Sequence, residues 1–285
     1  MSIAIRAYAK INWSLSVTGV RADGYHELDM LMQSIDLCDE LYCENARWLR
    51  LNVDGQNLPV GNQNLVVRAA QALNEYIGVR HGAVIRLRKR IPARAGLGGG
   101  SADCAAALVA LNRLWNLRLP MEKLVEIGAT LGADVPFCLT GGLARVRGIG
   151  EQVESLPEAG TIALCMCTPG GGLSTPQVFQ TYDEMHLQPQ PCNTLALAEA
   201  LRTGALERAQ HLSLNALEAP AIALMPQIGE TMEALRAMQA EYVRMSGSGS
   251  TVFGAFQSAE ASQTVAERLP GAYTARTVSQ GWEWL

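Results

Sequence analysis

The sequence of 285 residues has no long hydrophobic run, no signal-like N-terminus and no excess of positive charge. Its longest uninterrupted apolar run, Cys104 to Leu111, spans eight residues, well short of the ~20 that a membrane-spanning helix needs. Arg6 and Lys10 interrupt the apolar residues near the N-terminus, which argues against a signal peptide. The net charge of -4 argues against general nucleic-acid binding, because such proteins rely on excess positive charge. We therefore expect neither a membrane nor a nucleic acid as partner.

Cysteine and histidine are present, but not in the patterns that disulfides or metals require. The 7 cysteines are irregularly spaced, form no CxxC pair and are odd in number, so a complete disulfide framework is not expected. The 4 histidines include no HxxxH pair, and a structural zinc site has little support. These observations predict a reduced, cytoplasmic protein and name no protein ligand for a metal.

The composition that is present is that of an ordinary globular protein. Hydrophobic residues make up 48% and charged residues 18% of a chain long enough for about two domains. The segment from Glu151 to Gly160 is acidic and contains Pro157, which indicates a boundary. We predict an N-terminal domain over residues 1–153 and a C-terminal domain over residues 154–285.

Hydrophobic periodicity predicts the elements of the N-terminal half. Ser2 to Val17 alternates as one or two strands near a sheet edge, and Leu28 to Leu41 fits either a strand or a helix. Asp54-Gly55 is typical of a hairpin turn. Apolar residues at helical spacing follow Asn64, and Gly78 offers a stop to that helix.

The following elements enclose a glycine-rich segment. We predict a strand over residues 83–91, helices over residues 101–115 and 120–131, strands over 141–146 and 161–167, helices over 194–201, 206–214 and 228–238, and a strand–turn–strand unit over 245–256. Ser101 is expected to cap the first of these helices. The basic residues Arg86, Arg88, Lys89 and Arg90 lie beside this segment; they form either a solvated strand face or a surface that attracts polyanions.

The strongest chemical signal is the glycine-rich segment from Ile91 to Ala102. Glycine allows positive φ and close approach of a ligand, and the helix that follows presents N–H groups without intrahelical partners. A strand, a glycine loop and a helix N-terminus together can bind phosphate. The segment fits neither GxGxxG nor GxxxxGK[ST], and a tight structural turn is the alternative interpretation.

The pattern Pro92-x-x-x-Gly96-Leu97-Gly98-x-x-Ser101 resembles the phosphate-binding motif of the GHMP kinases. Further segments resemble one branch of these kinases in the same order along nearly the whole chain: residues 9–15, 21–28, 131–137, 169–179, 215–218 and 245–256. The resemblance implies a two-domain α+β fold. A ribosomal-S5-like N-terminal domain and a ferredoxin-like C-terminal domain would form the active site between them.

The resemblance also implies roles for particular residues. Asp134 and Lys10 match the catalytic aspartate and lysine, and a carboxylate within hydrogen-bond reach can take the proton of an acceptor hydroxyl. The expected ATP-binding residues are Lys89, Pro92, Ala93, Arg94, Ala95, Gly96, Leu97, Gly98, Gly99, Gly100, Ser101 and Ala102. The expected acceptor-binding residues are Asn12, Tyr25, His26, Phe179, Gly247 and Ser248, with the aromatic side chains around a cytosine ring.

The implied reaction is phosphorylation of an alcohol by ATP with Mg²⁺. In this branch the acceptor is a methylerythritol linked to cytidine diphosphate, an intermediate of the non-mevalonate route to isoprenoid precursors, and the expected state is a monomer or weak homodimer. Two alternatives remain: another GHMP kinase that acts on mevalonate, homoserine or a sugar, and a regulator that binds nucleotide without turnover.

Two positions of the glycine loop depart from the pattern of the family. Arg94 stands where a small residue or glycine is common, and Ala102 replaces a frequent second serine. Neither change removes a proposed catalytic group. Both leave the contacts to ATP open.

Overall fold

A computed structural model describes residues 2–285, which form two β-sheets covered by helices. The seven-stranded sheet contains β1 (Ser2–Val20), β2 (His26–Ala46), β3 (Arg50–Asp54), β4 (Gly82–Arg88), β5 (Leu143–Gly148), β6 (Gln152–Ser155) and β11 (Trp282–Trp284). Its order is β11-β1-β2-β4-β3, with β5 on β2 and β6 on β5. The four-stranded sheet contains β7 (Ala163–Cys167), β8 (Tyr242–Met245), β9 (Val252–Phe256) and β10 (Ala272–Arg276), in the order β10-β7-β9-β8.

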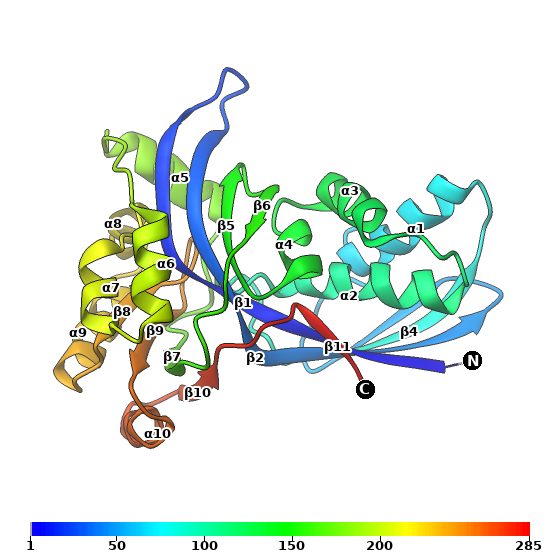
Figure 1. Cartoon of the computed structure of the whole chain (residues 1–285). Helices are drawn as coiled ribbons and strands as arrows, with labels where there is room; N and C mark the ends of the chain where they lie inside the picture. The colour runs from blue at the N-terminus through cyan, green and yellow to red at the C-terminus, as the bar shows by residue number, and fades with distance from the viewer. Residues whose placement is uncertain (1) are drawn as a thin grey trace.

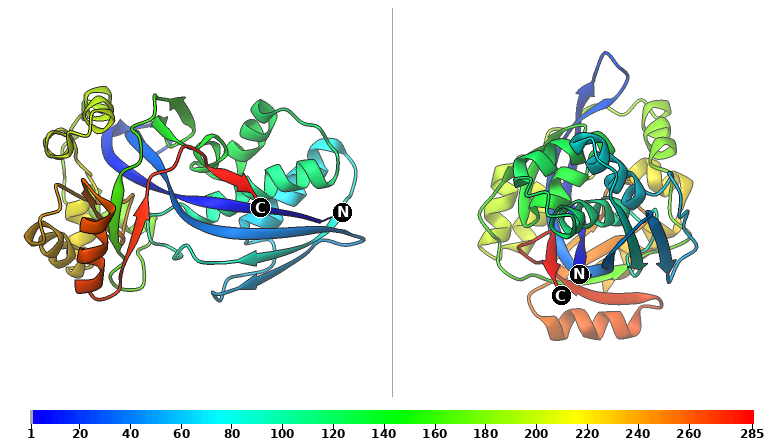
Figure 2. Two further views of the ribbon diagram at one scale, coloured as in Figure 1. Left: turned by 60° about the horizontal axis from the view of Figure 1, so that its bottom comes forward. Right: turned by 90° about the vertical axis from the view of Figure 1, so that its right-hand side faces the viewer.

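The helices divide between the two sheets, as Figures 1 and 2 show. Beside the larger sheet lie α1 (Leu65–Ile77), α2 (Gly99–Leu114), α3 (Met121–Leu131) and α4 (Val135–Thr140). The other half contains α5 (Thr175–Glu184), α6 (Thr194–Arg202), α7 (Leu206–Leu212), α8 (Glu218–Leu224), α9 (Gln227–Ala237) and α10 (Ala259–Arg268). None of these helices is long and apolar enough to cross a bilayer. The mixed α+β class is confirmed.

A long hairpin of β1 and β2 runs through the molecule from one half to the other (Figure 1). Its two strands pair antiparallel over almost their whole length, and three register shifts bend them. The segment from Leu28 to Leu41, which fitted either a strand or a helix, lies within β2. Apolar side chains are buried on both faces of this strand. β1 is not at the sheet edge, because the C-terminal strand β11 pairs with Ile5, Arg6 and Ala7.

Helix α2 is the central helix of the larger layer, and its alanine-rich sequence explains why. Small side chains let it approach the sheet closely, and most of its residues are buried. The helix begins at Gly99 rather than at Ser101, because Gly98 takes φ 66° and acts as the N-cap. The prediction that Ser101 caps this helix was therefore wrong, and its side chain lies within the first turn.

Several other sequence predictions need correction. Asp54-Gly55 does not close a hairpin, because β3 pairs parallel with β4 and the chain continues to α1. Helices α4, α5, α8 and α10 were not predicted. The helix after Asn64 is confirmed: Asn64 accepts a hydrogen bond from the amide of Val66, and Gly78 ends the helix at φ 68°.

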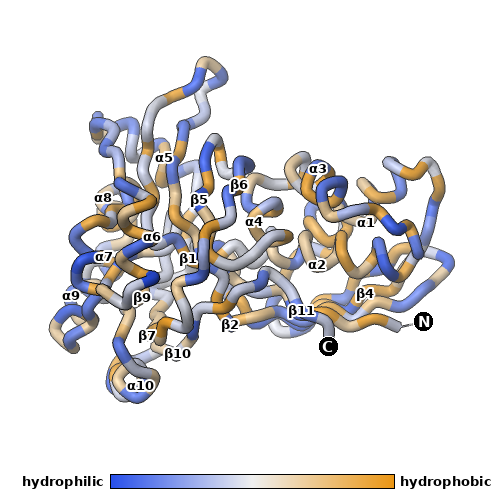
Figure 3. Tube along the Cα trace, in the orientation of Figure 1, coloured by the Kyte–Doolittle hydropathy of each residue, from blue (hydrophilic) through white to orange (hydrophobic). Residues whose placement is uncertain are grey.

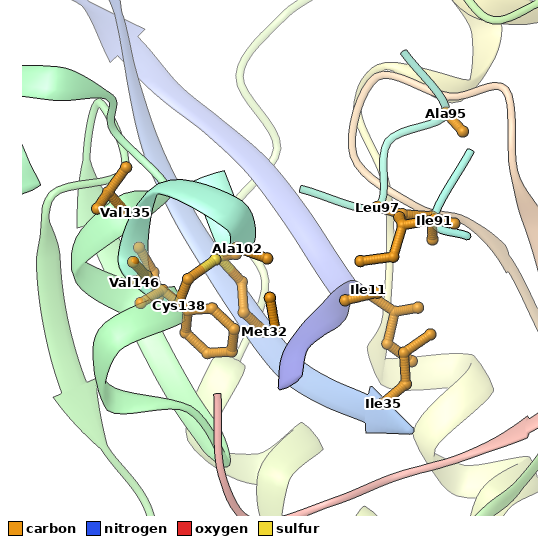
Figure 4. Packing of buried hydrophobic residues seen from close by; sticks show 14 of the residues in the cluster. Ile11, Met32, Ile35, Ile91, Ala95, Leu97, Ala102, Val135, Cys138 and Val146 are labelled. Atoms are coloured by element: carbon orange, nitrogen blue, oxygen red, sulfur yellow. The ribbon is translucent and has the colours of Figure 1, made fainter. Parts of the chain in front are cut away.

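The hydrophobic core is continuous across both halves of residues 2–285. Figure 3 shows hydrophobic stretches near β4 and near the start of β1, which lie on either side of β2, and Figure 4 shows Ile11, Ile91 and Leu97 in one part of this core. Ile91 lies at the start of the glycine loop and Leu97 between Gly96 and Gly98, and both are buried. Their burial fixes the loop on the core at two points. The domain boundary after residue 153 stays a prediction.

Candidate active site

A cleft of about 560 Å³ lies along the glycine loop and takes residues from both halves of the chain. Of the residues singled out from the sequence, those that line it are Lys10, Asn12, Lys89, Pro92, Ala93, Arg94, Ala95, Gly96, Leu97, Gly98, Gly99, Gly100, Ser101, Asp134, Phe179, Gly247 and Ser248. Ala102, Tyr25 and His26 are not among the lining residues. The fold therefore brings most of the predicted site to one place.

The glycine loop is attached to two different parts of the molecule. Its first part contacts the C-terminal half: Ala95 O accepts a hydrogen bond from Thr251 N, and Gly96 O accepts one from Ser246 Oγ at 2.9 Å. A side chain at Gly96 would collide with the Ser246 carbonyl, and φ there is 78°. Only glycine can occupy this position without displacing the neighbouring loop.

The second part of the loop contacts the N-terminal half. Leu97 O accepts a hydrogen bond from Lys10 N at 3.0 Å, and a Cβ on Gly98 would lie 2.9 Å from the Lys10 side chain. Helix α2 then begins at Gly99, and Gly99, Gly100 and Ser101 of its first turn line the cleft. The N–H groups of this turn and the positive end of the helix dipole can bind phosphate oxygens.

Lys10 and Asp134 meet in this cleft although they are far apart in the sequence. Lys10 Nζ lies 3.6 Å from Asp134 Oδ2, and it donates a hydrogen bond of 2.7 Å to Asn12 Oδ1. The lysine side chain is 6% exposed, whereas the aspartate side chain is 30% exposed. A ligand can thus reach the carboxylate of Asp134, while the ammonium of Lys10 is buried and held by Asn12.

Asn12 connects this pair to the glycine-rich turn between β8 and β9, at residues 246–251. Its amide N–H donates to Ser246 Oγ at 3.3 Å, and its side-chain Nδ2 contacts Met30 Sδ at 3.4 Å. A Cβ on Gly247 would lie 3.3 Å from Lys10 Nζ, so this turn passes directly beside the lysine. Asn215 holds the turn in place, because its Nδ2 donates to the carbonyls of Met245 and Gly247 at 2.8 Å each.

A second lysine centre lies beneath the start of α2. Lys89 Nζ forms ion pairs with Asp39 and with Asp103, the latter at 2.9 Å. The three side chains are 2%, 0% and 5% exposed respectively. Asp39 also accepts hydrogen bonds from Arg90 N and Ile91 N, so it holds the chain where β4 leads into the loop.

The charges of this buried cluster, formed by Asp39, Lys89 and Asp103, act on one another. Burial raises the pKa of Asp103 well above its usual range, and the carboxylate of Asp39 raises it further. Burial acts to lower the pKa of Lys89, but the charges of Asp103 and Asp39 raise it overall. Asp103 Oδ1 has no hydrogen-bond partner among the described residues. The ammonium of Lys89 is therefore neutralised within the protein.

An aromatic group lies around Phe179, which lines the cleft. The His26 and Phe179 rings stack with centroids 4.7 Å apart, and Tyr182 packs edge-on against His26. His26 Nε2 lies 2.8 Å from Asp183 Oδ1. Tyr25 stands outside this group and is 61% exposed. Phe179 alone of the three predicted aromatic residues lines the cleft.

Sequence reasoning missed several residues of the cleft. They are Leu15, Leu28, Met30, Leu58, Pro59, Gln63, Asn64, Leu65, Asp103, Ala133, Ile149, Thr175 and Leu217. Leu58, Pro59 and Leu65 are apolar and extend the cleft beyond Gly100, where a purine ring could pack. The polar sequence between β3 and α1 gave no signal of this, because only the fold brings it to the glycine loop.

The fold and the cleft define a small-molecule kinase of the GHMP class. The family model of the GHMP kinases N terminal domain matches residues 64–142, and that of the GHMP kinases C terminal domain matches residues 197–275. The crystal structure of a homoserine kinase from Cytophaga hutchinsonii shares the fold with a TM-score of 0.76 at 21% identity, over 100% of this chain and 97% of that one.

Relatives of higher sequence identity indicate which branch of the GHMP kinases this chain belongs to. The 4-diphosphocytidyl-2-C-methyl-D-erythritol kinase of Pelotomaculum thermopropionicum is 43% identical over 270 residues, which cover 94% of each chain. A crystal structure of 4-(cytidine 5'-diphospho)-2C-methyl-D-erythritol kinase superposes with a TM-score of 0.81 at 36% identity, over 97% of this chain and 99% of that one. This chain belongs to the 4-diphosphocytidyl-2-C-methyl-D-erythritol kinase family of the GHMP kinases.

Proposed function

We propose that this chain transfers the γ-phosphoryl group of ATP to the 2-hydroxyl of 4-diphosphocytidyl-2-C-methyl-D-erythritol, with Lys10 and Asp134 at the reacting oxygen. The observation that carries the proposal is the ion pair of Lys10 with Asp134, together with the hydrogen bond from Lys10 N to Leu97 O of the glycine loop, in a cleft that Phe179 also lines. Membership of the family supports the same activity. The reaction belongs to the non-mevalonate route to isoprenoid precursors.

The triphosphate of ATP would lie along residues 96–101, at the N-terminus of α2. Phosphoryl transfer depends mainly on alignment and on neutralising charge, and backbone N–H groups supply both without reorganising. Mg²⁺ would enter with ATP, since an ion on the β- and γ-phosphates takes most of its ligands from phosphate and water oxygens. The adenine would pack on Leu58, Pro59 and Leu65.

The acceptor hydroxyl would lie between Asp134 and the γ-phosphate. The exposed carboxylate of Asp134 accepts a hydrogen bond from this hydroxyl and takes its proton as the new P–O bond forms. Lys10 holds the carboxylate in place and presents positive charge to the transferred phosphoryl group. Asn12 fixes the lysine and can contact the other hydroxyls of the acceptor.

The cytosine ring would pack against Phe179. His26 already covers one face of Phe179, so the ring has the other face of Phe179 available, and Tyr25 has the exposure needed to close over it. Asp183 holds His26 in a fixed orientation beside this position. Gly247 and Ser248 also line the cleft, with Gly247 beside Lys10, where they can contact the diphosphate of the acceptor.

An ADP-release assay across four acceptors tests the proposal. We expect turnover with the cytidine diphosphate compound and none with mevalonate, homoserine or galactose. Turnover of mevalonate but not of the cytidine compound would select another GHMP kinase activity. Binding of ATP without turnover of any acceptor would indicate a non-catalytic regulator.

Three further properties are part of this proposal. The acceptor is a small molecule, and no nucleic acid is expected as ligand, since the net charge is -4. We expect a cytoplasmic enzyme that is a monomer or a weak homodimer. Analytical ultracentrifugation with and without ATP measures the oligomeric state.

A further inference from the structure

Arg94 has a backbone conformation that arginine rarely adopts. Its φ is 56°, in the left-handed region that glycine enters without strain. The loop that precedes α5 supports this conformation: Leu173 N donates a hydrogen bond of 3.1 Å to Arg94 O. A Cβ on Gly172 would lie 2.5 Å from the same carbonyl oxygen, so the two loops are in close contact.

Arg94 also differs from the other cations of the cleft in its charge balance. Three cationic side chains line the cleft: Lys10, Lys89 and Arg94. Lys10 is paired with Asp134, and Lys89 is paired with Asp39 and Asp103. Within residues 2–285, Arg94 is the cation of this cleft that has no carboxylate partner. Its guanidinium is exposed and available to an anionic ligand.

The position of Arg94 separates it from the expected triphosphate site. The glycine loop contacts the N-terminal half from Leu97 onward, whereas Arg94 contacts the loop before α5. That loop continues directly into Thr175, whose Oγ1 lies 2.7 Å from Ser248 Oγ, and helix α5 then presents Phe179. The backbone of Arg94 therefore contacts the segment that leads to Phe179, where the cytosine would pack.

We propose that the guanidinium of Arg94 binds the diphosphate of the cytidine diphosphate substrate rather than the phosphates of ATP. This assignment rests on the proposed function and adds a binding residue to it. A planar guanidinium donates parallel hydrogen bonds to two phosphate oxygens, which a lysine cannot reproduce.

Isothermal titration with CDP, cytidine and ATP tests the assignment in the Arg94→Asn variant. Asparagine tolerates positive φ but carries no charge, so the backbone is kept while the guanidinium is removed. We expect the affinity for CDP to fall about tenfold, corresponding to about 1.4 kcal/mol, with the affinities for cytidine and ATP unchanged. Arg94→Lys should recover part of the loss. A fall for ATP with CDP unchanged would overturn the assignment, and so would no change for either ligand.

Arg118→Asn is the matched control, because Arg118 is exposed and has nearly the same φ, 57°, but does not line the cleft. It should bind all three ligands like the unsubstituted protein. Arg94→Gly should be at least as thermally stable as the unsubstituted protein while losing affinity for CDP, which separates binding from folding. Failure of the unsubstituted protein to bind CDP would instead contradict the proposed function.

Discussion

Two lysine–aspartate centres lie on either side of the glycine loop, and they differ in their access to the cleft. Around Lys10, the partner Asp134 has a side chain that is 30% exposed. Around Lys89, the side chains of Asp39 and Asp103 are 0% and 5% exposed. A reachable carboxylate can take a hydrogen bond from a substrate hydroxyl, whereas an enclosed one can only hold its neighbours. The same residue types can thus support chemistry at one centre and fixed geometry at the other.

The buried centre should be the more sensitive of the two in stability. Lys89→Met leaves Asp39 and Asp103 buried without their cation, and breaking such a pair typically costs about 3–5 kcal/mol. Chemical denaturation measures this loss in the free energy of unfolding. The control is Lys123→Met, since Lys123 pairs with Glu126 on the surface of α3 and should change little. Equal losses in the two variants would remove the distinction between the centres.

The open centre should be the more sensitive in catalysis. Asp134→Asn keeps the shape of the side chain but removes the group that takes the proton, so kcat should fall at least ~100-fold. The free energy of unfolding should stay close to that of the unsubstituted protein. Steady-state kinetics together with denaturation measure both quantities. An unchanged kcat would end the assignment of Asp134 as the proton acceptor.

A change at the proposed cytosine site of the open cleft should affect binding of the cytidine substrate but not binding of ATP. Phe179→Ala removes the proposed stacking surface, and stacking on an aromatic side chain typically contributes about 1–3 kcal/mol for each base. We expect the KM of the cytidine substrate to rise about tenfold or more, while the KM of ATP stays the same. Phe253→Leu, a change in the core away from the cleft, serves as the comparison for general effects on folding. A rise in the KM of ATP alone would indicate that ATP, and not the cytosine ring, packs against Phe179.

The smallest effect is expected at Glu40, which follows Asp39 on β2 and faces the opposite side of the sheet. A hydrogen bond from Tyr42 lowers the pKa of Glu40, and Arg90 and Arg88 lower it further. The stability that this group adds is present above its ordinary pKa of 4.5 and is lost as the pH falls through the lowered value. Glu40→Gln should therefore cost about 1 kcal/mol or less at neutral pH, because exposed arginines are screened by water.

Denaturation of the two proteins between about pH 3 and pH 7 measures this difference. The difference between the unsubstituted protein and Glu40→Gln should shrink toward the acidic end of this range. A difference that grows toward acid would contradict the lowered pKa. A loss as large as that of Lys89→Met would show that the surface pairs contribute as much as the buried cluster.

Local sequence was sufficient for much of the fold. The helix from Leu65 to Ile77 has its Asn64 cap and Gly78 stop in the sequence, and local chemistry decides both ends. The strand–turn–strand unit predicted over residues 245–256 is present in its turn and in β9, but its first strand, β8, lies mostly before the predicted start. In contrast, Asp54-Gly55 was misleading, since turn composition does not reveal whether the following strand returns antiparallel or the chain continues to a helix.

In the candidate site, too, some features can be predicted from local sequence and others are seen only in the folded structure. The glycine loop and its position before a helix can be recognised in the sequence, because φ freedom and helix N-termini are local properties. The start of α2 was not placed correctly, since Gly98 takes the cap position at φ 66° without a side-chain hydrogen bond, whereas the sequence suggested a serine cap. Lys89 looked like part of a basic strand face, and only its burial between Asp39 and Asp103 shows that its charge is balanced internally.

By itself, the sequence determined many of the strands and helices, the glycine loop before α2, and which residue types are available for phosphoryl transfer. The tertiary structure decided which of them meet. Lys10 comes from β1, Asp134 from the start of α4 and Phe179 from α5, and their distances depend on how the two sheets pack along the long hairpin. The physical reason is that backbone preference acts over a few residues, whereas the burial and charge of a side chain depend on neighbours that the chain supplies from far away.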